Sequence, residues 1–313
     1  MALSILVAAT VVGGCAALTD RRADAREEAA ELAYPPTGQM IDVGGVTIHA
    51  HVQGTGPDLV LIHGASGNTR DFTYALVDQL AKRYRVIAFD RPGMGWSDPL
   101  PDGDISPTGQ AQILAAAADT LGVRDPIVLG HSYGGAVAMA WGLLHPDDTG
   151  ALVIVSGATM PWPGGLGGWY AIAASRIGAA TVIPAVTAFA PTARTAAVVG
   201  TIFAPDPVPA GYADYVGIGL TLRRDALRVN ARQVGGLKPY LAQMLPRYGS
   251  LTLPVELIHG MADTTVPARI HAIPLAGLLP NAHLDLIEGA AHMPHHSHAD
   301  RVIAAIDRAN ARR

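Results

Sequence analysis

The chain has little cysteine and little charge. Its 313 residues include one cysteine, Cys15, so neither a disulfide framework nor a cysteine-based zinc site can form within one chain. Charged residues make up 15% of the sequence, the formal net charge is −4 and there is no long basic run, which argues against a nucleic-acid partner. The sequence also lacks a Walker pattern, a dinucleotide fingerprint after a strand and any internal repeat.

The most informative segment that is present is residues 130–134, Gly-His-Ser-Tyr-Gly. It follows the apolar run at 127–129 and precedes a stretch of small residues at 135–140. A buried strand that turns sharply into a helix through G-x-S-x-G is the nucleophile elbow, in which a strained serine projects its hydroxyl into a pocket. Ser132 is therefore the predicted nucleophile.

A second apolar strand, at residues 59–62, runs into a loop of small residues at 63–67. Acyl transfer builds negative charge on the carbonyl oxygen, and two backbone N–H groups must point at it. One follows the nucleophile and one comes from the loop after an earlier strand. The predicted donors are the amides of Tyr133 and Ala65.

An acid and a base follow two later strands. Asp263 lies just beyond the apolar strand at 254–259, and His292 follows the short strand at 284–287. A histidine base needs a carboxylate that fixes its tautomer, and the chain order Ser, Asp, His is the one that a nucleophile elbow uses. The other place for an acid, after the strand at 152–155, holds no carboxylate. We therefore expect Asp263 to orient His292, the general base.

Three further histidines, His295, His296 and His298, follow closely. Their spacing, with no cysteine and no HExxH pattern, does not match a common zinc arrangement. We expect them to be surface residues that open the last helix. The sequence predicts no metal site and no organic cofactor.

Five motifs together resemble the α/β-hydrolase family. They are H-G-x-x-G at 63–67, D-R-P-G-x-G-x-S-D at 90–98, G-H-S-x-G-G at 130–135, G-x-x-D-x-x-V-P at 260–267 and G-x-x-H at 289–292. The resemblance spans about residues 40–157 and 250–313. It implies that 90–98 is a structural turn beside the active site that supplies no catalytic group.

The order of elements predicts an α/β protein with a mostly parallel eight-stranded sheet, helices on both faces and a helical cap insertion. Residues 40–43 and 47–52 form an antiparallel edge hairpin, and a helix begins at Ser106-Pro107. Buried strands alternating with helices imply the parallel sheet. The other strands are expected at 58–62, 85–89, 126–130, 151–156, 254–259 and 283–287.

Between about residues 158 and 250 the strand pattern is replaced by Ala, Gly, Pro and aromatic residues, where the family places its cap. Helices are expected at 168–180, 184–200, 209–219, 222–233 and 237–245. The aromatic residues there either line the substrate site or form the core of the cap. They are Trp162, Trp169, Tyr170, Phe189, Phe203, Tyr212 and Tyr215. Four arginines are expected on a solvated face rather than in a carboxylate clamp. They are Arg223, Arg224, Arg228 and Arg232.

The N-terminus predicts a targeting or anchor segment at 1–19, a helical, solvated tether at 20–37, and the hydrolase core at 38–157 and 251–313. The apolar stretch at 3–12 has the length of a signal-peptide h-region. Val-Gly-Gly-Cys at 12–15 resembles a bacterial lipobox, with Cys15 the lipidation candidate. A lipoprotein, an uncleaved membrane anchor, and a misplaced start or buried helix remain open. We expect a bacterial cell-envelope location, with the cytoplasm as the alternative.

These features predict a serine hydrolase that acts on a small-molecule ester, thioester or lactone. Cleavage of a C–C bond, amide hydrolysis or cofactor-free perhydrolysis on the same triad are alternatives, because the fold does not choose among them. A ligand receptor that keeps the triad without turnover is an alternative of another class. The sequence does not determine the oligomeric state.

Overall fold

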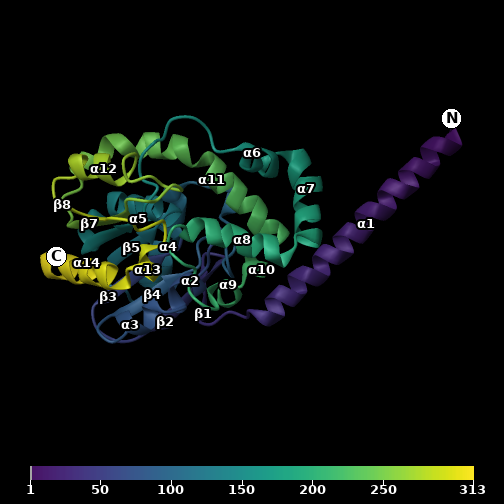
Figure 1. Ribbon diagram of the computed structural model, residues 1–313. Coiled ribbons are helices and arrows are strands. Elements are labelled where there is room, and N and C mark those ends of the chain that lie inside the picture. Colours follow the sequence, from purple (N-terminus) through teal and green to yellow (C-terminus); the bar gives the residue numbers. More distant parts are fainter. Residues whose placement is uncertain (1) are drawn as a thin grey trace.

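The computed structural model, which describes residues 2–313 and the side chains of residues 13–191 and 194–313, contains one eight-stranded sheet (Figure 1). Its strand order is β1-β2-β4-β3-β5-β6-β7-β8. The strands are β1 (Gln39–Val43), β2 (Val46–Gln53), β3 (Asp58–Ile62), β4 (Arg85–Phe89), β5 (Ile127–His131), β6 (Ala151–Val155), β7 (Val255–Gly260) and β8 (Ala282–Ile287). The predicted strands are confirmed to within a residue or two.

The sheet is antiparallel only at one edge. β1 and β2 form the expected hairpin, and β2 also pairs antiparallel with β4. All other neighbours are parallel, with Leu59 of β3 opposite Val86 on one side and Ile127 on the other. Because parallel strands point the same way, the loops after β3, β5, β7 and β8 meet at one edge of the sheet.

Helices cover both faces of the sheet, and a hydrophobic cluster fills the space on each side. One cluster joins the strands to α4, α5 and α12, and the other joins them to α2, α3 and α14. Ser106 caps α4, its Oγ accepting from the amide of Gly109, as the sequence predicts. The core helices are α2 (Arg70–Thr73), α3 (Leu76–Leu80), α4 (Pro107–Thr120), α5 (Tyr133–Leu144), α12 (Ala272–Leu278), α13 (Pro294–Ser297) and α14 (Ala299–Arg312). Short 3-10 turns are Pro101–Gly103, Pro146–Asp148 and Leu245–Ser250.

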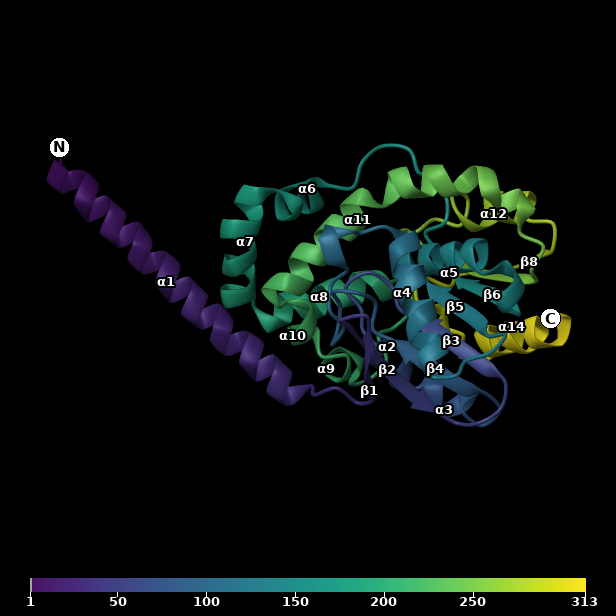
Figure 2. The same cartoon turned by 180° about the vertical axis from the view of Figure 1, so that it is seen from behind.

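A helical insertion between β6 and β7 lies over one end of the sheet (Figures 1 and 2). Its helices are α6 (Gly168–Ala174), α7 (Arg176–Phe189), α8 (Thr192–Phe203), α9 (Tyr212–Tyr215), α10 (Ile218–Thr221) and α11 (Arg224–Met244). The predicted boundaries of the first two helices are wrong. Ser175 caps α7 through a bond from Gly178, so the chain bends by 104° there, and Pro184 lies inside α7 rather than at a helix start.

α11 is one continuous helix where the sequence predicts two. Gly235 and Gly236 suggest a break, because glycine weakens a helix interior. In the structure a Cβ on Gly236 would stand 2.7 Å from Cδ1 of Ile105, so this glycine allows close packing of the helix. The predicted helix at 209–219 is likewise divided, because Gly217 takes a left-handed φ of +65° between α9 and α10.

The N-terminal helix α1 (Ala2–Ala33) docks on the cap through its second half, while its N-terminal end projects away from the molecule (Figures 1 and 2). The prediction of a solvated tether is wrong for this half, since Ala23 and Ala30 are buried. Arg22 and Arg26 donate to the carbonyls of Ala188 and Ala190, where the C-terminal end of α7 leaves carbonyls free.

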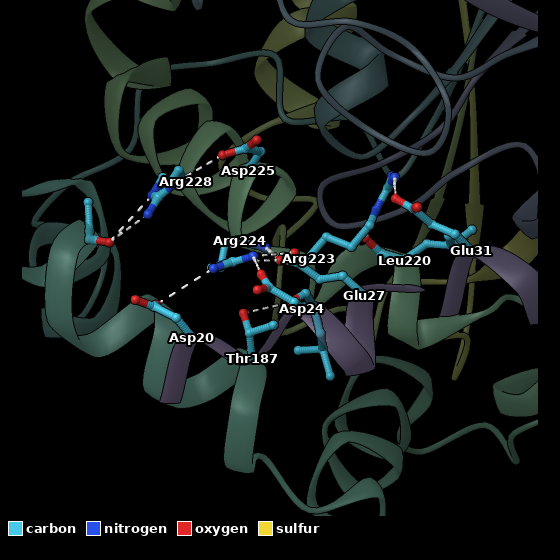
Figure 3. A network of polar contacts seen from close by, with 12 residues as sticks. Asp20, Asp24, Glu27, Glu31, Thr187, Leu220, Arg223, Arg224, Asp225 and Arg228 are labelled. Carbon is cyan, nitrogen blue, oxygen red and sulfur yellow. Dashed lines mark hydrogen bonds and ion pairs between the residues drawn. The ribbon is translucent and has the colours of Figure 1, made fainter. Parts of the chain in front are cut away.

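Acidic residues of α1 hold two of the four cap arginines (Figure 3). Arg223 pairs with Glu31, and Arg224 pairs with Glu27 and Asp24. Glu27 Oε1 also accepts the backbone N–H of Arg224 at 2.6 Å, and so caps α11, whose own N-cap residue makes no side-chain cap bond. The prediction of a solvated arginine face is therefore wrong for this pair, because the partners lie far away in the sequence.

Among the described residues, no single helix has the length and hydropathy of a membrane span, although α6 and α7 meet that test as a bent pair. Met1 and the side chains of the apolar stretch at 3–12 lie outside the described residues. Cys15 lies within α1 and is exposed.

Candidate active site

Ser132 occupies a strained turn between β5 and α5. Its φ of +53° with ψ of −118° is unfavourable for a residue with a side chain, and such strain persists only where the surroundings enforce it. The neighbouring glycines enforce it here. A Cβ on Gly130 would lie 2.1 Å from the carbonyl oxygen of Gly134, and one on Gly134 would lie 2.1 Å from that of Ile62. The local geometry is that of a nucleophile elbow.

The predicted acid and base are joined by a hydrogen bond. Nδ1 of His292 lies 2.7 Å from Oδ2 of Asp263, and both are buried. The other oxygen, Oδ1, accepts the backbone N–H groups of Thr265 and Val266, both at 2.8 Å. Because an ionised carboxylate only accepts, we assign the His292 proton to Nδ1, which leaves Nε2 free to take a proton.

Asp263 stays ionised despite its burial. Burial alone would raise the pKa of Asp263, but hydrogen bonds from His259 and His292 outweigh it and hold that pKa well below its usual range. His259, at the end of β7, was not predicted as a site residue. Its Nε2 donates to the carbonyl of Val266 at 2.6 Å and lies 3.2 Å from Oδ2 of Asp263. A histidine closing the strand before the acid is the sequence signal that could have indicated this contact.

The segments that carry Ser132 and His292 meet through His131. Nε2 of His131 donates to the backbone carbonyl of His292 at 3.0 Å, and the two rings are 4.9 Å apart. The residue before the predicted nucleophile is therefore bonded to the predicted base. All three triad candidates lie in loops that follow parallel strands at the same edge of the sheet.

The loop that contains Ala65 packs against Ser132. A Cβ on Gly64 would stand 3.0 Å from Cβ of Ser132, so a larger residue there would crowd Ser132. Ser66 is held at a φ of +58°, and its N–H donates to Oδ1 of the buried cap residue Asn230 at 2.8 Å. The amide of Tyr133 opens α5, where the first N–H groups of a helix lack an intrahelical acceptor. Both predicted donors thus belong to segments that adjoin Ser132.

Arg91 contacts both of the segments that carry these predicted donors. Its fully buried guanidinium donates to the carbonyls of His63 and Gly64, and it stacks 4.3 Å from the ring centre of Tyr133. Its partners are neutral, and burial lowers the pKa of Arg91 to about 10. The family resemblance predicts a structural turn at residues 90–98. The turn fits that prediction, since the Asp90 carboxylate accepts the backbone N–H groups of Thr69 and Trp96. The contact of Arg91 with the loop that contains Ala65 was not predicted.

The seven aromatic cap candidates divide into three groups. Trp162 and Tyr170 line a cavity of about 390 Å³ between the cap loop and α11, and Ser132 is not among its lining residues. Phe203 and Tyr212 are buried with Met293, next to His292. The remaining three, Trp169, Phe189 and Tyr215, are more exposed. The guanidinium of Arg22 lies over the ring of Phe189, and the hydroxyl of Tyr215 donates to the carbonyl of Thr73.

The expectation that His295 and His296 are surface residues is wrong. Both side chains are almost fully buried, and both reach the carboxylate of Asp71 in α2. Tyr212 of the cap donates to the same carboxylate at 2.6 Å. The segment is polar in sequence, but cap residues from some eighty positions earlier cover it. Asp71, His131 and His295 place one potential metal-ligand atom each within 4.8 Å of the others.

Serine, histidine and aspartate that follow three strands of one parallel sheet, under a helical cap, define the class of α/β enzymes with a nucleophile elbow. The chain belongs to the alpha/beta hydrolase family, whose model matches residues 59–305, and it is a hydrolase.

Comparison with individual proteins gives three informative matches. An uncharacterised protein of Mycobacterium tuberculosis is 28% identical over 288 residues, covering 88% of this chain and 81% of that protein. A 2-hydroxymuconate semialdehyde hydrolase from Pseudomonas sp. strain CF600 is 31% identical over 131 residues, 41% of this chain and 46% of that enzyme. The structure of a bacterial membrane phospholipase A, described as a virulence factor, matches with a TM-score of 0.67 and 20% identity, covering 98% of this chain and 97% of that one. This last likeness shows the fold.

Proposed function

We propose that the protein is a serine hydrolase that cleaves an ester, thioester or lactone of a moderately apolar small molecule through an acyl-enzyme intermediate. The observation that carries the proposal is the strained Ser132, at the elbow whose preceding residue bonds His292, itself paired with Asp263. Strain of this kind costs about 1–3 kcal/mol and gathers at functional sites.

In the proposed reaction, Nε2 of His292 takes the proton of the Ser132 hydroxyl as its oxygen attacks the substrate carbonyl. Asp263 is poised to stabilise the imidazolium, since its depressed pKa keeps it ionised. The imidazolium then protonates the leaving group, and water repeats the cycle to release the acid. The amides of Ala65 and Tyr133 receive the oxyanion, a contribution worth about 2.7–4 kcal/mol per donor in other serine hydrolases.

The cap supports a substrate of low polarity. The cavity between the cap loop and α11, whose lining does not include Ser132, is lined largely by apolar groups, including Ile105, Trp162, Leu166 and Tyr170. Its two cationic lining residues are occupied, because Arg232 donates to the carbonyl of Gly103 and Lys238 to that of Gly164. A carboxylate clamp is thus not favoured, and an acyl chain or ring of moderate size fits this surface better.

The test is labelling with a fluorophosphonate probe, followed by assay of p-nitrophenyl esters of increasing chain length. Ser132→Ala should abolish labelling and lower kcat by about 10⁴- to 10⁶-fold, because triad members act as a unit. Ser156→Ala is the matched control, since Ser156 is also buried at a strand end with a positive φ. Equal labelling of the wild type and the Ser132 variant would contradict the proposal, as would saturable ligand binding with negligible turnover, which is the receptor alternative.

A second candidate is hydrolysis of a C–C bond in a vinylogous diketone. It is favoured by the partial match to the Pseudomonas 2-hydroxymuconate semialdehyde hydrolase. The same triad serves both reactions, so a substrate panel must separate them. A kcat/KM for a 2-hydroxy-6-oxo-dienoate at least tenfold above that for the best ester would favour the C–C reaction.

We further propose that the N-terminal segment attaches the enzyme to the bacterial cell envelope, either through a lipid on Cys15 or as an uncleaved anchor. The exposed position of Cys15 in α1 supports this, because the α1 residues that bond the cap in the described part of that helix follow Cys15 in the sequence. The match to a membrane phospholipase A over nearly the whole chain also supports it. Mass measurement of the membrane fraction from a bacterial host tests the proposal, and an unmodified, full-length, freely soluble chain would contradict it.

A further inference from the structure

A buried cluster of polar side chains lies behind the triad and takes no part in the proposed reaction. It comprises Asp71 of α2, His131 at the end of β5, and His295 and His296 of α13. All four side chains are more than nine-tenths buried. Burying a carboxylate among imidazoles is costly unless each polar atom finds a partner.

Three ring nitrogens of the cluster, Nδ1 of His131, His295 and His296, lack such a partner among the described residues, and that of His131 lies opposite the carboxylate of Asp71. Nε2 of His131 carries its proton, because it bonds the carbonyl oxygen of His292, which can only accept. Nδ1 of the neutral ring is then a bare lone pair, and among the described residues it has no hydrogen-bond partner. It faces Oδ2 of Asp71 at 3.9 Å, so two acceptors confront each other. A cation between them would resolve this arrangement.

The two oxygens of Asp71 have different surroundings. Oδ1 accepts the hydroxyl of Tyr212 at 2.6 Å and Nε2 of His296 at 2.8 Å. Oδ2 faces His131, and Nε2 of His295 lies between the two oxygens, 3.2 Å from Oδ2 and 3.3 Å from Oδ1. The satisfied oxygen thus orients the carboxylate, and the other oxygen points toward the imidazoles.

We propose that Oδ2 of Asp71, Nδ1 of His131 and Nε2 of His295 bind a divalent transition-metal ion of the zinc type. Zinc–nitrogen and zinc–oxygen bonds of about 2.0–2.1 Å place tetrahedral ligands roughly 3.4 Å apart. The ligand atoms here are 3.2 and 3.9 Å apart for the two pairs with Asp71, and all three lie within 4.8 Å of one another, so small side-chain rotations close the site.

The surroundings of the site fit a metal centre. A ligating histidine usually donates its other N–H to a carbonyl or carboxylate, and His131 already does so to His292. His295 binds through Nε2 once its proton moves to Nδ1, so no proton is gained or lost. That Nδ1 is buried without a partner among the described residues, so metal binding must offset the cost of an unpaired N–H there. The ion would tie α2, the elbow and α13 together one residue from Ser132 and three residues from His292. Its role is to position these segments, and the fourth coordination position is left to water.

The test uses the purified full-length chain after treatment with a chelator. Addition of Co²⁺ should give visible ligand-field bands that saturate at one equivalent, Zn²⁺ should displace them, and Zn²⁺ should raise the thermal midpoint. His295→Gln should weaken the Kd for Zn²⁺ by at least the roughly 10- to 100-fold that loss of an outer-shell partner costs, since it removes a ligand. His298→Gln is the matched control and should bind like the wild type, because His298 lies outside the cluster and bonds Ser297.

The wild-type titration decides the matter even if the His295 variant does not fold. A wild-type protein that gives no ligand-field bands and takes up less than one equivalent at saturating Zn²⁺ would overturn the proposal. An equal Kd in wild type and His295→Gln would overturn it too, because the metal would then be bound elsewhere. Neither outcome depends on ester hydrolysis, so the metal site and the proposed reaction fail independently.

Discussion

Asn230 of the cap should control the oxyanion loop. Its Oδ1 accepts the N–H of Ser66, which is held at a φ of +58° directly after the proposed donor Ala65. A left-handed non-glycine residue costs about 1 kcal/mol or more, and a neutral hydrogen bond contributes about 1 kcal/mol. Asn230→Ala removes the contribution that holds the strain. The conformation in which the loop is bonded to the cap should then lose about 1–2 kcal/mol of stability, which corresponds to a fall in kcat of roughly 5- to 30-fold.

The assay is steady-state hydrolysis of the best p-nitrophenyl ester, with kcat and KM determined separately. An oxyanion donor acts mainly in the transition state, so kcat should fall while KM changes little. Asn281→Ala is the matched control, since that asparagine bonds Thr252 at the opposite edge of the sheet. A kcat for Asn230→Ala within twofold of the wild type, with the fold intact, would refute the idea that the cap positions this loop.

Three further outcomes concern stability. Burial, together with the nearby charge of Arg91, lowers the pKa of His63 to about 4 in the folded protein. Between pH 6.5 and pH 4 the unfolded chain therefore binds more protons than the folded protein, so the free energy of unfolding falls as the pH falls. In the wild type, the free energy of unfolding should therefore fall between pH 8 and pH 5, and His63→Gln should make this fall smaller by about 2 kcal/mol, as measured by urea unfolding. The same fall in the wild type and the variant would contradict this. Glu27→Arg should weaken the docking of α1 on the cap and make α1 more susceptible to limited proteolysis. Adding Arg224→Glu should partly restore docking, because the charges of the pair are then exchanged, with a coupling energy between the two positions of about 1 kcal/mol. Gly134→Ala should lower the free energy of unfolding by about 3 kcal/mol or more, because its Cβ would lie 2.1 Å from a backbone oxygen. Gly200→Ala should leave that free energy nearly unchanged, because the space around Gly200 is open.

The sheet and the triad candidates could be predicted because their signals are local. A parallel strand buried on both faces is a continuous apolar run, and residues 151–155 illustrate this with no exposed position. The elbow is equally local, since the crowding that requires glycine at 130 and 134 comes from the turn itself and the adjoining strand. Because loops after parallel strands share one edge, Asp263 and His292 could be placed together from the order of elements alone.

The cap and the buried histidines could not be predicted, because their environments are set by distant parts of the chain. His296 belongs to a polar stretch, yet Phe203 and Tyr212 pack against its ring. Arg224 has four charged neighbours in its own segment, yet its partners lie about two hundred residues earlier. Periodicity carries no information on such contacts. The same holds for Gly236, where a residue that normally weakens a helix serves packing against Ile105.

Helix α11 contacts three parts of the molecule that lie far apart in the sequence. Its first residue, Arg224, is capped by Glu27 of the N-terminal helix, Asn230 bonds the oxyanion loop, and Gln233 accepts from the guanidinium of Arg91 at 2.7 Å. A helix is stiff over this length, so its N-terminal end cannot shift without moving the turn that holds Asn230 and Gln233. Docking of α1 on the cap therefore bears on the position of the proposed oxyanion donors, and the segment proposed to reach the envelope is mechanically joined to the catalytic edge of the sheet.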